Sequence, residues 1–170
     1  QVHVQGVADH VISTVSKQAA DNKVRVETDI AASLGTVEMD ANWIQTALVN
    51  LMENAVDACI YDAEKKDHYV KLTVEAKDAD TICFSIEDNG IGMDRKTREL
   101  LFTLFFSSKG SKGTGLGLFI SNHVVEQHGG SIRVQSRAGE GSCFEVCLPR
   151  KKADYPVVSF FPKTYKSITF

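Results

Sequence analysis

Two asparagines stand one helical turn apart in the segment ANWIQTALVNLMENAVDACIYD. Apolar residues recur at helical spacing here, and Asp40 is a good N-cap, so we predict a helix of about five turns. Asn50, Asn54, Asp57 and Tyr61 then lie along one face of this helix. A solvated helix face is the simpler interpretation. Asparagine gains little from mid-helix positions, however, and its amide oxygen can bind a hard cation such as Mg²⁺ without adding charge, so we predict a metal site there.

A carboxylate and two glycines follow in the segment SIEDNGIGMD. Asn-Gly is a strong hairpin signal, but the residues after Gly92 show no strand alternation, so no strand pairs back. We therefore place Asp88 at the end of a central strand, with Gly90 and Gly92 allowing a planar ligand to approach the backbone. A carboxylate in that position can accept a hydrogen bond from the exocyclic amine of adenine.

Four glycines and two lysines precede an apolar helix in the segment KGSKGTGLGLFI. Gly113, Gly115 and Gly117 would expose backbone N–H groups at a helix N-terminus, which is an anion site. Lys109 and Lys112 could neutralise phosphate charge. A flexible linker is disfavoured, since a glycine inside a helix costs about 1 kcal/mol. Neither the P-loop order nor the dinucleotide-binding order of glycines fits this segment.

In this order, the three segments resemble the catalytic, ATP-binding domain of bacterial two-component sensor histidine kinases, in the superfamily of DNA gyrase, a mismatch-repair ATPase and a heat-shock chaperone. NLMENAVDA resembles the N box of that family and DNGIG its first glycine box; LFTLFFSSKG resembles the F box and GTGLGL the second glycine box. The resemblance covers roughly residues 2–149. It implies an α+β fold, a two-layer sandwich of a mixed, mainly antiparallel sheet and about three helices, with a mobile ATP lid over about residues 93–114.

The resemblance implies ATP and Mg²⁺ as cofactors. Asn54 would ligate the metal with support from Asn50, Asp88 would hold the adenine amine, and Lys109 would reach the phosphates. The positions expected in or beside the nucleotide site are Asn50, Asn54, Asp57, Ala58, Asp88, Gly90, Gly92, Met93, Lys109, Lys112, Gly113, Thr114, Gly115, Leu116 and Gly117. Two of them depart from the family pattern: Asp57 replaces a common basic residue, and Ala58 replaces a common aromatic residue, which leaves stacking on the purine in doubt.

The resemblance also implies a reaction, the donation of the γ-phosphoryl group to a histidine on a separate dimerisation domain, which then serves a response regulator. Hydrolases of the superfamily carry a Glu four residues before the magnesium Asn. This chain has Asn50 there, which cannot act as a general base, so we expect no fast hydrolysis and assign no catalytic residue. The alternatives are a serine kinase of the anti-sigma-factor type, an ATP-driven conformational clamp and a non-catalytic nucleotide-binding module.

The acceptor histidine is expected outside this sequence. None of the histidines stands in the His-Glu or His-Asp context of the family's acceptor helix; they are His3, His10, His68, His123 and His128. His10 is expected on a helix surface and His128 at a helix end.

Periodicity predicts the elements that must position these groups. The first residues are expected to form a short strand, followed by a helix from about Val7 to the segment ADN. A strand is predicted in KVRVETDI and a short extended piece in TVEMD. Two strand pairs are predicted, YVKLTVEAKD with TICFSIED and SIRVQSRA with SCFEVCLP, separated by a loop and a helix from about Leu116 to Gln127. We predict an ATP-binding domain over residues 1–150 and an extension of unknown role over residues 151–170.

Composition excludes several classes of protein. The 170 residues carry a formal net charge of -3, so a nucleic-acid partner is not expected. No apolar run reaches the roughly 20 residues needed to span a bilayer, so no direct membrane contact is expected. We expect a cytoplasmic location. Gln1 suggests that the sequence is a piece of a longer parent protein, which a segment outside this sequence could anchor in a membrane.

The four cysteines, none of them at C-x-x-C spacing, are expected to be reduced core residues: Cys59, Cys83, Cys143 and Cys147. A zinc or disulfide role stays open as the less favoured alternative.

Overall fold

The longest helix, α2 (Ala41–Ile60), forms where the apolar spacing predicts it. Asp40 caps it, because its side chain accepts hydrogen bonds from the backbone N–H groups of Asn42 and Trp43 at 3.1 and 3.3 Å. One stripe of α2 is buried: Ile44, Ala47, Leu48, Leu51, Met52, Ala55, Val56 and Cys59. The computed structural model describes residues 1–103 and 115–151, and α2 lies at the centre of this part of the chain.

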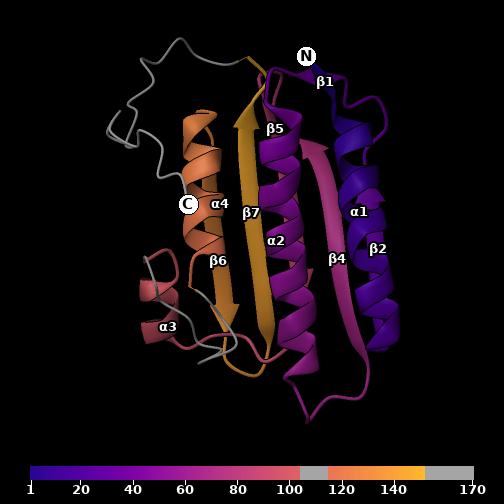
Figure 1. Cartoon of the computed structure of the whole chain (residues 1–170), viewed down its shortest axis with the longest axis vertical. Coiled ribbons are helices and arrows are strands. Elements are labelled where there is room, and N and C mark those ends of the chain that lie inside the picture. The colour runs from indigo at the N-terminus through magenta and orange to yellow at the C-terminus, as the bar shows by residue number, and fades with distance from the viewer. Residues whose placement is uncertain (104–114, 152–170) are drawn as a thin grey trace, which may run out of the picture.

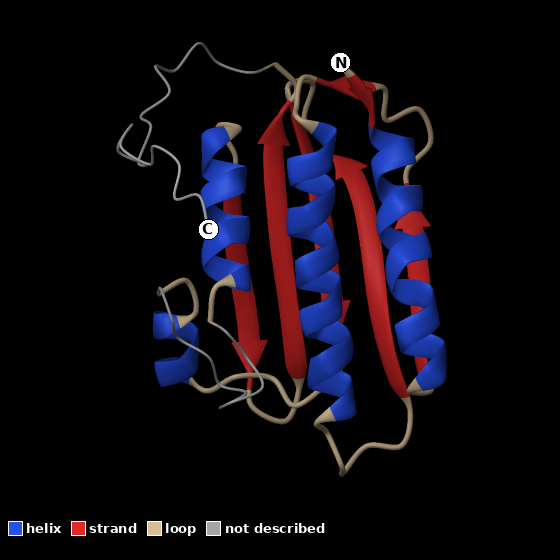
Figure 2. Ribbon diagram, viewed as in Figure 1, coloured by secondary structure: helices blue, strands red, loops and turns tan. Residues whose placement is uncertain are grey.

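Three long helices cover one face of the main sheet, as Figures 1 and 2 show. Besides α2 these are α1 (Val4–Asp21) and α4 (Gly117–Gln127). The helix α1 begins three residues earlier than predicted. His10 is exposed on α1, as expected. The predicted helix after the glycine loop is confirmed within one residue at its start.

The main sheet has the strand order β2-β4-β5-β7-β6. Its strands are β2 (Val24–Ile30), β4 (His68–Ala76), β5 (Thr81–Asp88), β6 (Ser131–Arg137) and β7 (Gly141–Pro149). Only β2 and β4 are parallel, joined through α2, and the other neighbours are antiparallel. A separate two-stranded sheet pairs β1 (Val2–His3) with β3 (Thr36–Val37). The predicted α+β sandwich with a mixed, mainly antiparallel sheet is confirmed.

The two faces of the main sheet differ in chemistry. Ile82, Phe84 and Ile86 of β5 are buried beneath the helices. Residues between them point to the opposite face, which no helix covers in the described part of the chain. The outermost strands carry charged residues, among them Arg25 and Glu27 on β2 and Arg133 and Arg137 on β6.

A fourth helix was not predicted. The helix α3 (Arg95–Leu100) lies within the range predicted as a loop, and Asp94 caps it by accepting a hydrogen bond from Thr97 N at 2.7 Å. The expectation of a loop from residue 93 onward is therefore wrong for these residues. No residue of α3 is buried, so no apolar stripe marks it in the sequence. Residues 104–114 of the predicted lid, including Phe105 and Phe106, and residues 152–170 of the predicted extension lie outside the described residues.

The expectation that all cysteines are reduced is also wrong. Cys83 of β5 and Cys147 of β7 are joined by a disulfide, while Cys59 and Cys143 are free. The two bonded cysteines are direct partners in the β5–β7 register, although 64 positions separate them in the chain. Spacing along the sequence could not reveal this neighbourhood. No helix among the described residues is both long and apolar enough to cross a bilayer.

Candidate functional site around helix α2

Asp88 is buried at the end of β5, with 4% of its surface exposed. Its Oδ1 accepts a hydrogen bond from Gly90 N at 2.9 Å. Burial raises the pKa of Asp88 to about 6, while the backbone N–H groups of Gly90 and Ser142 and the charge of Lys65 act in the opposite direction. The predicted place of this carboxylate at a strand end is confirmed.

The loop after Asp88 rests directly on the backbone of α2. A Cβ at Gly90 would collide with the backbone of Ala58 and Cys59, so only glycine fits this contact. Ile91 N also donates to Ala58 O at 3.1 Å. The backbone of Ala58 is therefore the contact point on α2 for the loop that follows Asp88.

A second part of the same loop rests on the β6–β7 hairpin. Gly92 has a positive φ of 62°, and a Cβ there would collide with Arg137 O. Gly139 N donates to Ile91 O at 2.7 Å, and Met93 N donates to Ser136 Oγ at 2.8 Å. The loop between β5 and α3 is thus fixed on both sides.

Lys65 supports this loop and was not predicted from the sequence. Its Nζ donates to the carbonyl oxygens of Asn89 at 2.6 Å and Gly90 at 3.3 Å, and it lies 3.5 Å from Asp62 Oδ2. The Asn89 side chain accepts from Tyr69 N at 2.9 Å. Lys65 comes from the loop between α2 and β4, where its sequence context DAEKKD reads as an ordinary charged turn.

The second glycine segment also packs on α2, eight residues before Ala58. A Cβ at Gly117 would lie 2.6 Å from Asn50 Oδ1. Asn50 Nδ2 donates to Ser121 Oγ at 2.9 Å, so Asn50 joins α2 to the first turns of α4. Leu116 is the N-cap position of α4 without a side-chain cap bond, and Gly115 before it has a φ of 66°.

Asn54 lies on α2 midway between these two contacts. Residues four apart share a helix face, so Asn50, Asn54 and Ala58 are neighbours along α2. Asn54 is half-buried, and its Nδ2 donates to Asn50 O at 2.8 Å. Asp57, on the side toward α1, accepts from Gln18 Nε2 at 3.4 Å. The helix α2, which carries both asparagines, therefore contacts the Asp88 loop and the start of α4 on the same face.

Open grooves border both ends of this arrangement. A groove of about 680 Å³ has Asp88, Ser142, Ser136 and Arg98 among its lining residues. A second groove, of about 260 Å³, lies between α2 and α4 and is lined in part by Asn50 and Gly117. Lys109, Lys112, Gly113 and Thr114 fall outside the described residues, so the predicted phosphate-binding part of the site has no described geometry.

A family model for histidine kinase-, DNA gyrase B- and HSP90-like ATPases matches residues 39–152, about two thirds of the chain, and includes all three predicted segments. The chain belongs to this ATPase family. The predicted resemblance is thereby confirmed, and membership of this ATPase family implies that the chain binds ATP. The match begins beside Asp40, the cap of α2.

Curated relatives of the chain include a sensor histidine kinase and a sporulation kinase. Sensor histidine kinase ZraS of Salmonella typhi is 31% identical over 150 residues, covering 87% of this chain and 30% of the relative. Sporulation kinase E of Bacillus subtilis is 29% identical, covering 86% of this chain and 19% of the relative. The chain spans less than a third of either relative.

Solved structures within the family share the fold. Full-length ShkA in complex with AMPPNP has a TM-score of 0.76 and 26% identity, over 89% of this chain and 31% of that protein. The mycobacterial sensor histidine kinase MprB has a TM-score of 0.73 and 26% identity, over 89% of this chain and 97% of that structure. Sensor histidine kinases are transferases, which agrees with the predicted class of enzyme.

Proposed function

We propose that this chain binds Mg-ATP around α2 and donates the γ-phosphoryl group to a histidine on a separate helical dimerisation domain. The observation that supports this most directly is the place of Asn54 between two glycine contacts on one helix. Gly90 seats the Asp88 loop at one end, and Gly117 seats the start of α4 at the other. A nucleotide spanning these ends would have its purine near Asp88 and its phosphates near the α4 N-terminus.

The chain's own groups fit the parts of this ligand. Asp88 would accept a hydrogen bond from the adenine amine, and Lys65 would hold the Asn89–Gly90 backbone in place. Asn54 supplies an amide oxygen, the neutral hard ligand that Mg²⁺ accepts alongside phosphate oxygens and water. The magnesium ion would neutralise phosphate charge when bound. Donor chemistry and position therefore agree with a magnesium site at Asn54.

Hydrolysis is disfavoured by the residue one turn before Asn54. Asn50 occupies that position and already donates to Ser121, and an amide cannot take a proton from water. Glu53, the nearest carboxylate in sequence, is exposed and turned about 100° around the helix from Asn54. Positioning of ATP for transfer to another group is therefore the favoured chemistry.

The acceptor is proposed to lie on another domain because no histidine of this chain is followed by Glu or Asp, as the acceptor histidine of the family is. His10 is exposed on α1. His128 ends α4, where Nδ1 lies 2.7 Å from Val124 O and Nε2 accepts from Asp40 N at 3.1 Å. A cytoplasmic location and a response regulator as the next partner belong to the same proposal.

Calorimetric titration with a non-hydrolysable ATP analogue tests the binding site. We expect Asp88→Ala and Asn54→Ala each to weaken binding by about tenfold or more, which equals about 1.4 kcal/mol, and only Asn54→Ala to abolish the gain from added Mg²⁺. Glu53→Ala is the matched control on α2 and should bind as the parent does. Unchanged affinity of Asp88→Ala would show that the adenine assignment is wrong.

Incubation with γ-labelled ATP tests the reaction. The chain alone should acquire no label, and addition of a dimerisation domain from a related sensor kinase such as ZraS should yield acid-labile label on that domain. Label on this chain alone would contradict the proposal.

A further inference from the structure

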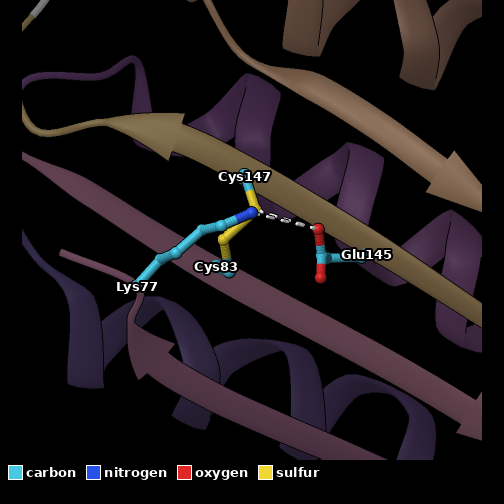
Figure 3. Close-up of a disulfide and its surroundings, with 4 residues drawn as sticks. All are labelled: Lys77, Cys83, Glu145 and Cys147. Atoms are coloured by element: carbon cyan, nitrogen blue, oxygen red, sulfur yellow. Dashed lines mark hydrogen bonds and ion pairs between the residues drawn. A yellow bond between two sulfur atoms is a disulfide. The ribbon is translucent and has the colours of Figure 1, made fainter.

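The disulfide between Cys83 and Cys147 lies outside the proposed nucleotide site, on the face of the sheet that no helix of the described residues covers (Figure 3). Cys83 alternates with the buried Ile82 and Phe84, so its side chain points away from the helix-covered core. Cys147 is the direct partner of Cys83 across the β5–β7 ladder. The bond therefore joins two strands whose hydrogen bonds already hold them in register.

Charged groups flank this disulfide on the same face. Glu145 Oε1 lies 3.4 Å from Cys147 Sγ and 3.9 Å from Lys77 Nζ. Figure 3 shows Lys77 on the same side of the sheet as Glu145, its ion-pair partner. Arg133 of β6 is the register partner of Glu145 on the neighbouring strand. A carboxylate beside a sulfur atom disfavours the thiolate, and Lys77 offsets this effect by pairing with Glu145. A lower pKa of the leaving thiol speeds disulfide exchange.

The two sulfur atoms differ in access. Cys83 is 3% exposed, whereas Cys147 is half-buried. An incoming thiolate can therefore approach Cys147 Sγ from the uncovered face, with Cys83 as the leaving group.

The two free cysteines lack these features. Burial, the charge of Asp88 and the charge of Asp62 raise the pKa of Cys59 to about 12. Burial and the carboxylates of Glu87, Glu145 and Asp88 raise the pKa of Cys143. Both thiols are held in the protonated, unreactive form, and neither is a register partner of another cysteine. The pair on β5 and β7 is therefore the one disulfide among the described residues.

We propose that Cys83 and Cys147 form a reversible thiol–disulfide exchange site that reacts with dithiol reductants at Cys147. One thiolate of the dithiol attacks Cys147 Sγ, the S–S bond breaks, and Cys83 leaves as a thiolate. The second thiolate then displaces Cys147 from the mixed disulfide and closes the reductant's own disulfide. Two electrons pass to the protein, and the two protons of the dithiol reach the two released thiolates through solvent. Lys77 is a positioning residue that pairs with Glu145 and so offsets the negative charge beside the thiolates.

Thiol counting on the whole chain tests the state of the pair. The air-oxidised protein, once denatured, should show the two thiols of Cys59 and Cys143 to an aromatic disulfide reagent, and it should show four after treatment with dithiothreitol in the folded state. Peptide mapping should find Cys83 linked to Cys147. Four thiols in the air-oxidised protein, or a bond that dithiothreitol cannot reduce until the chain unfolds, would overturn the proposal.

The rate of reduction tests the role of Lys77. A change of one unit in the leaving-thiol pKa alters exchange rates by about threefold, so Lys77→Met should slow reduction by about that factor while Lys77→Arg retains the rate. Lys66→Met, at an exposed lysine of another loop, is the control. Equal rates for Lys77→Met and the parent would overturn the role of Lys77.

Cys83, Cys147 and Glu145 could instead hold a soft metal ion once the disulfide is reduced, because their ligand atoms lie within 4.8 Å of one another. Titration of the reduced protein with Zn²⁺ separates the two roles. We expect Zn²⁺ to leave the Tm of the reduced protein unchanged. The contrary result is a rise in Tm with Zn²⁺ that is lost in Glu145→Gln. Such a rise would replace the exchange site by a metal site.

Discussion

At the scale of single residues, Asp88 is buried, although its proposed role toward adenine uses the charged carboxylate. Its pKa is raised to about 6 in the fold, against about 4 in an unfolded chain. Between these values the folded chain holds the proton and the unfolded chain releases it, so the free energy of unfolding falls as pH rises through this window. The carboxylate that would recognise adenine thus destabilises the fold at neutral pH.

Asp88→Asn should remove this pH dependence. Relative to the parent, the variant should gain up to about 3 kcal/mol of stability between pH 4 and pH 7, because it has no charge to bury. Urea unfolding at intervals across this range measures the difference. Parallel pH profiles of the two proteins would contradict the assignment.

Lys65 offers a second prediction at this scale. Lys65→Met removes the hydrogen bonds to the Asn89 and Gly90 carbonyl oxygens and should weaken ATP-analogue binding by about threefold to tenfold. The pKa of Asp88 should rise further, since the charge of Lys65 lowers it. Lys66→Met provides the neighbouring control. Titration calorimetry decides the outcome, and equal losses in both variants would exclude a specific role.

The places of several site residues could be predicted from single positions, while their roles toward the nucleotide stay predictions. Asp88, Gly90 and Asn54 stand out because their types are unusual for a strand end or a helix interior. Lys65 could not be found this way, since a lysine in a charged turn carries no signal. Its role depends on the backbone carbonyl oxygens of Asn89 and Gly90, which lie 24 and 25 positions later in the chain.

At the scale of elements, the two glycine contacts on α2 determine how the site is assembled. Gly90→Ala should destabilise the chain by about 2–4 kcal/mol, because the new methyl group meets the backbone of α2, which cannot rotate away. Gly6→Ala is the contrasting variant: nothing lies near its Cβ position in α1, so it should stabilise by up to about 1 kcal/mol. Chemical denaturation of both variants tests the pair, and similar effects would show that the Gly90 contact is not tight.

Long, strongly patterned elements were predictable, and short ones were not. The apolar stripe of α2 and the Asp40 cap define that helix from local information, and the two hairpins follow from alternation and turn residues. The helix α3 has six residues and buries none of them, so its sequence lacks any periodic signal. The contact between Gly117 and Asn50 could not be predicted, because it depends on how α4 packs against α2 and not on the sequence of either helix alone.

At the scale of the whole molecule, the disulfide closes a loop of 64 positions between β5 and β7. In the chain-entropy description such a link stabilises the fold by about 4 kcal/mol. Cys83→Ser should therefore lower the Tm of the oxidised protein by about 10 °C and leave that of the reduced protein nearly unchanged. Cys143→Ser is the control at a free cysteine of the same strand as Cys147. Scanning calorimetry with and without dithiothreitol measures both, and equal shifts under the two conditions would contradict the link.

The charged border strands of the sheet bear on how the molecule assembles. Arg25 and Glu27 on β2, and Arg133 and Arg137 on β6, would each face an incoming strand from another copy. Transferring these groups into an intermolecular ladder would cost desolvation energy, which discourages amyloid-like stacking and open-ended polymerisation. Concentrated samples of the chain should for this reason stay free of fibrils that grow from the β2 and β6 borders.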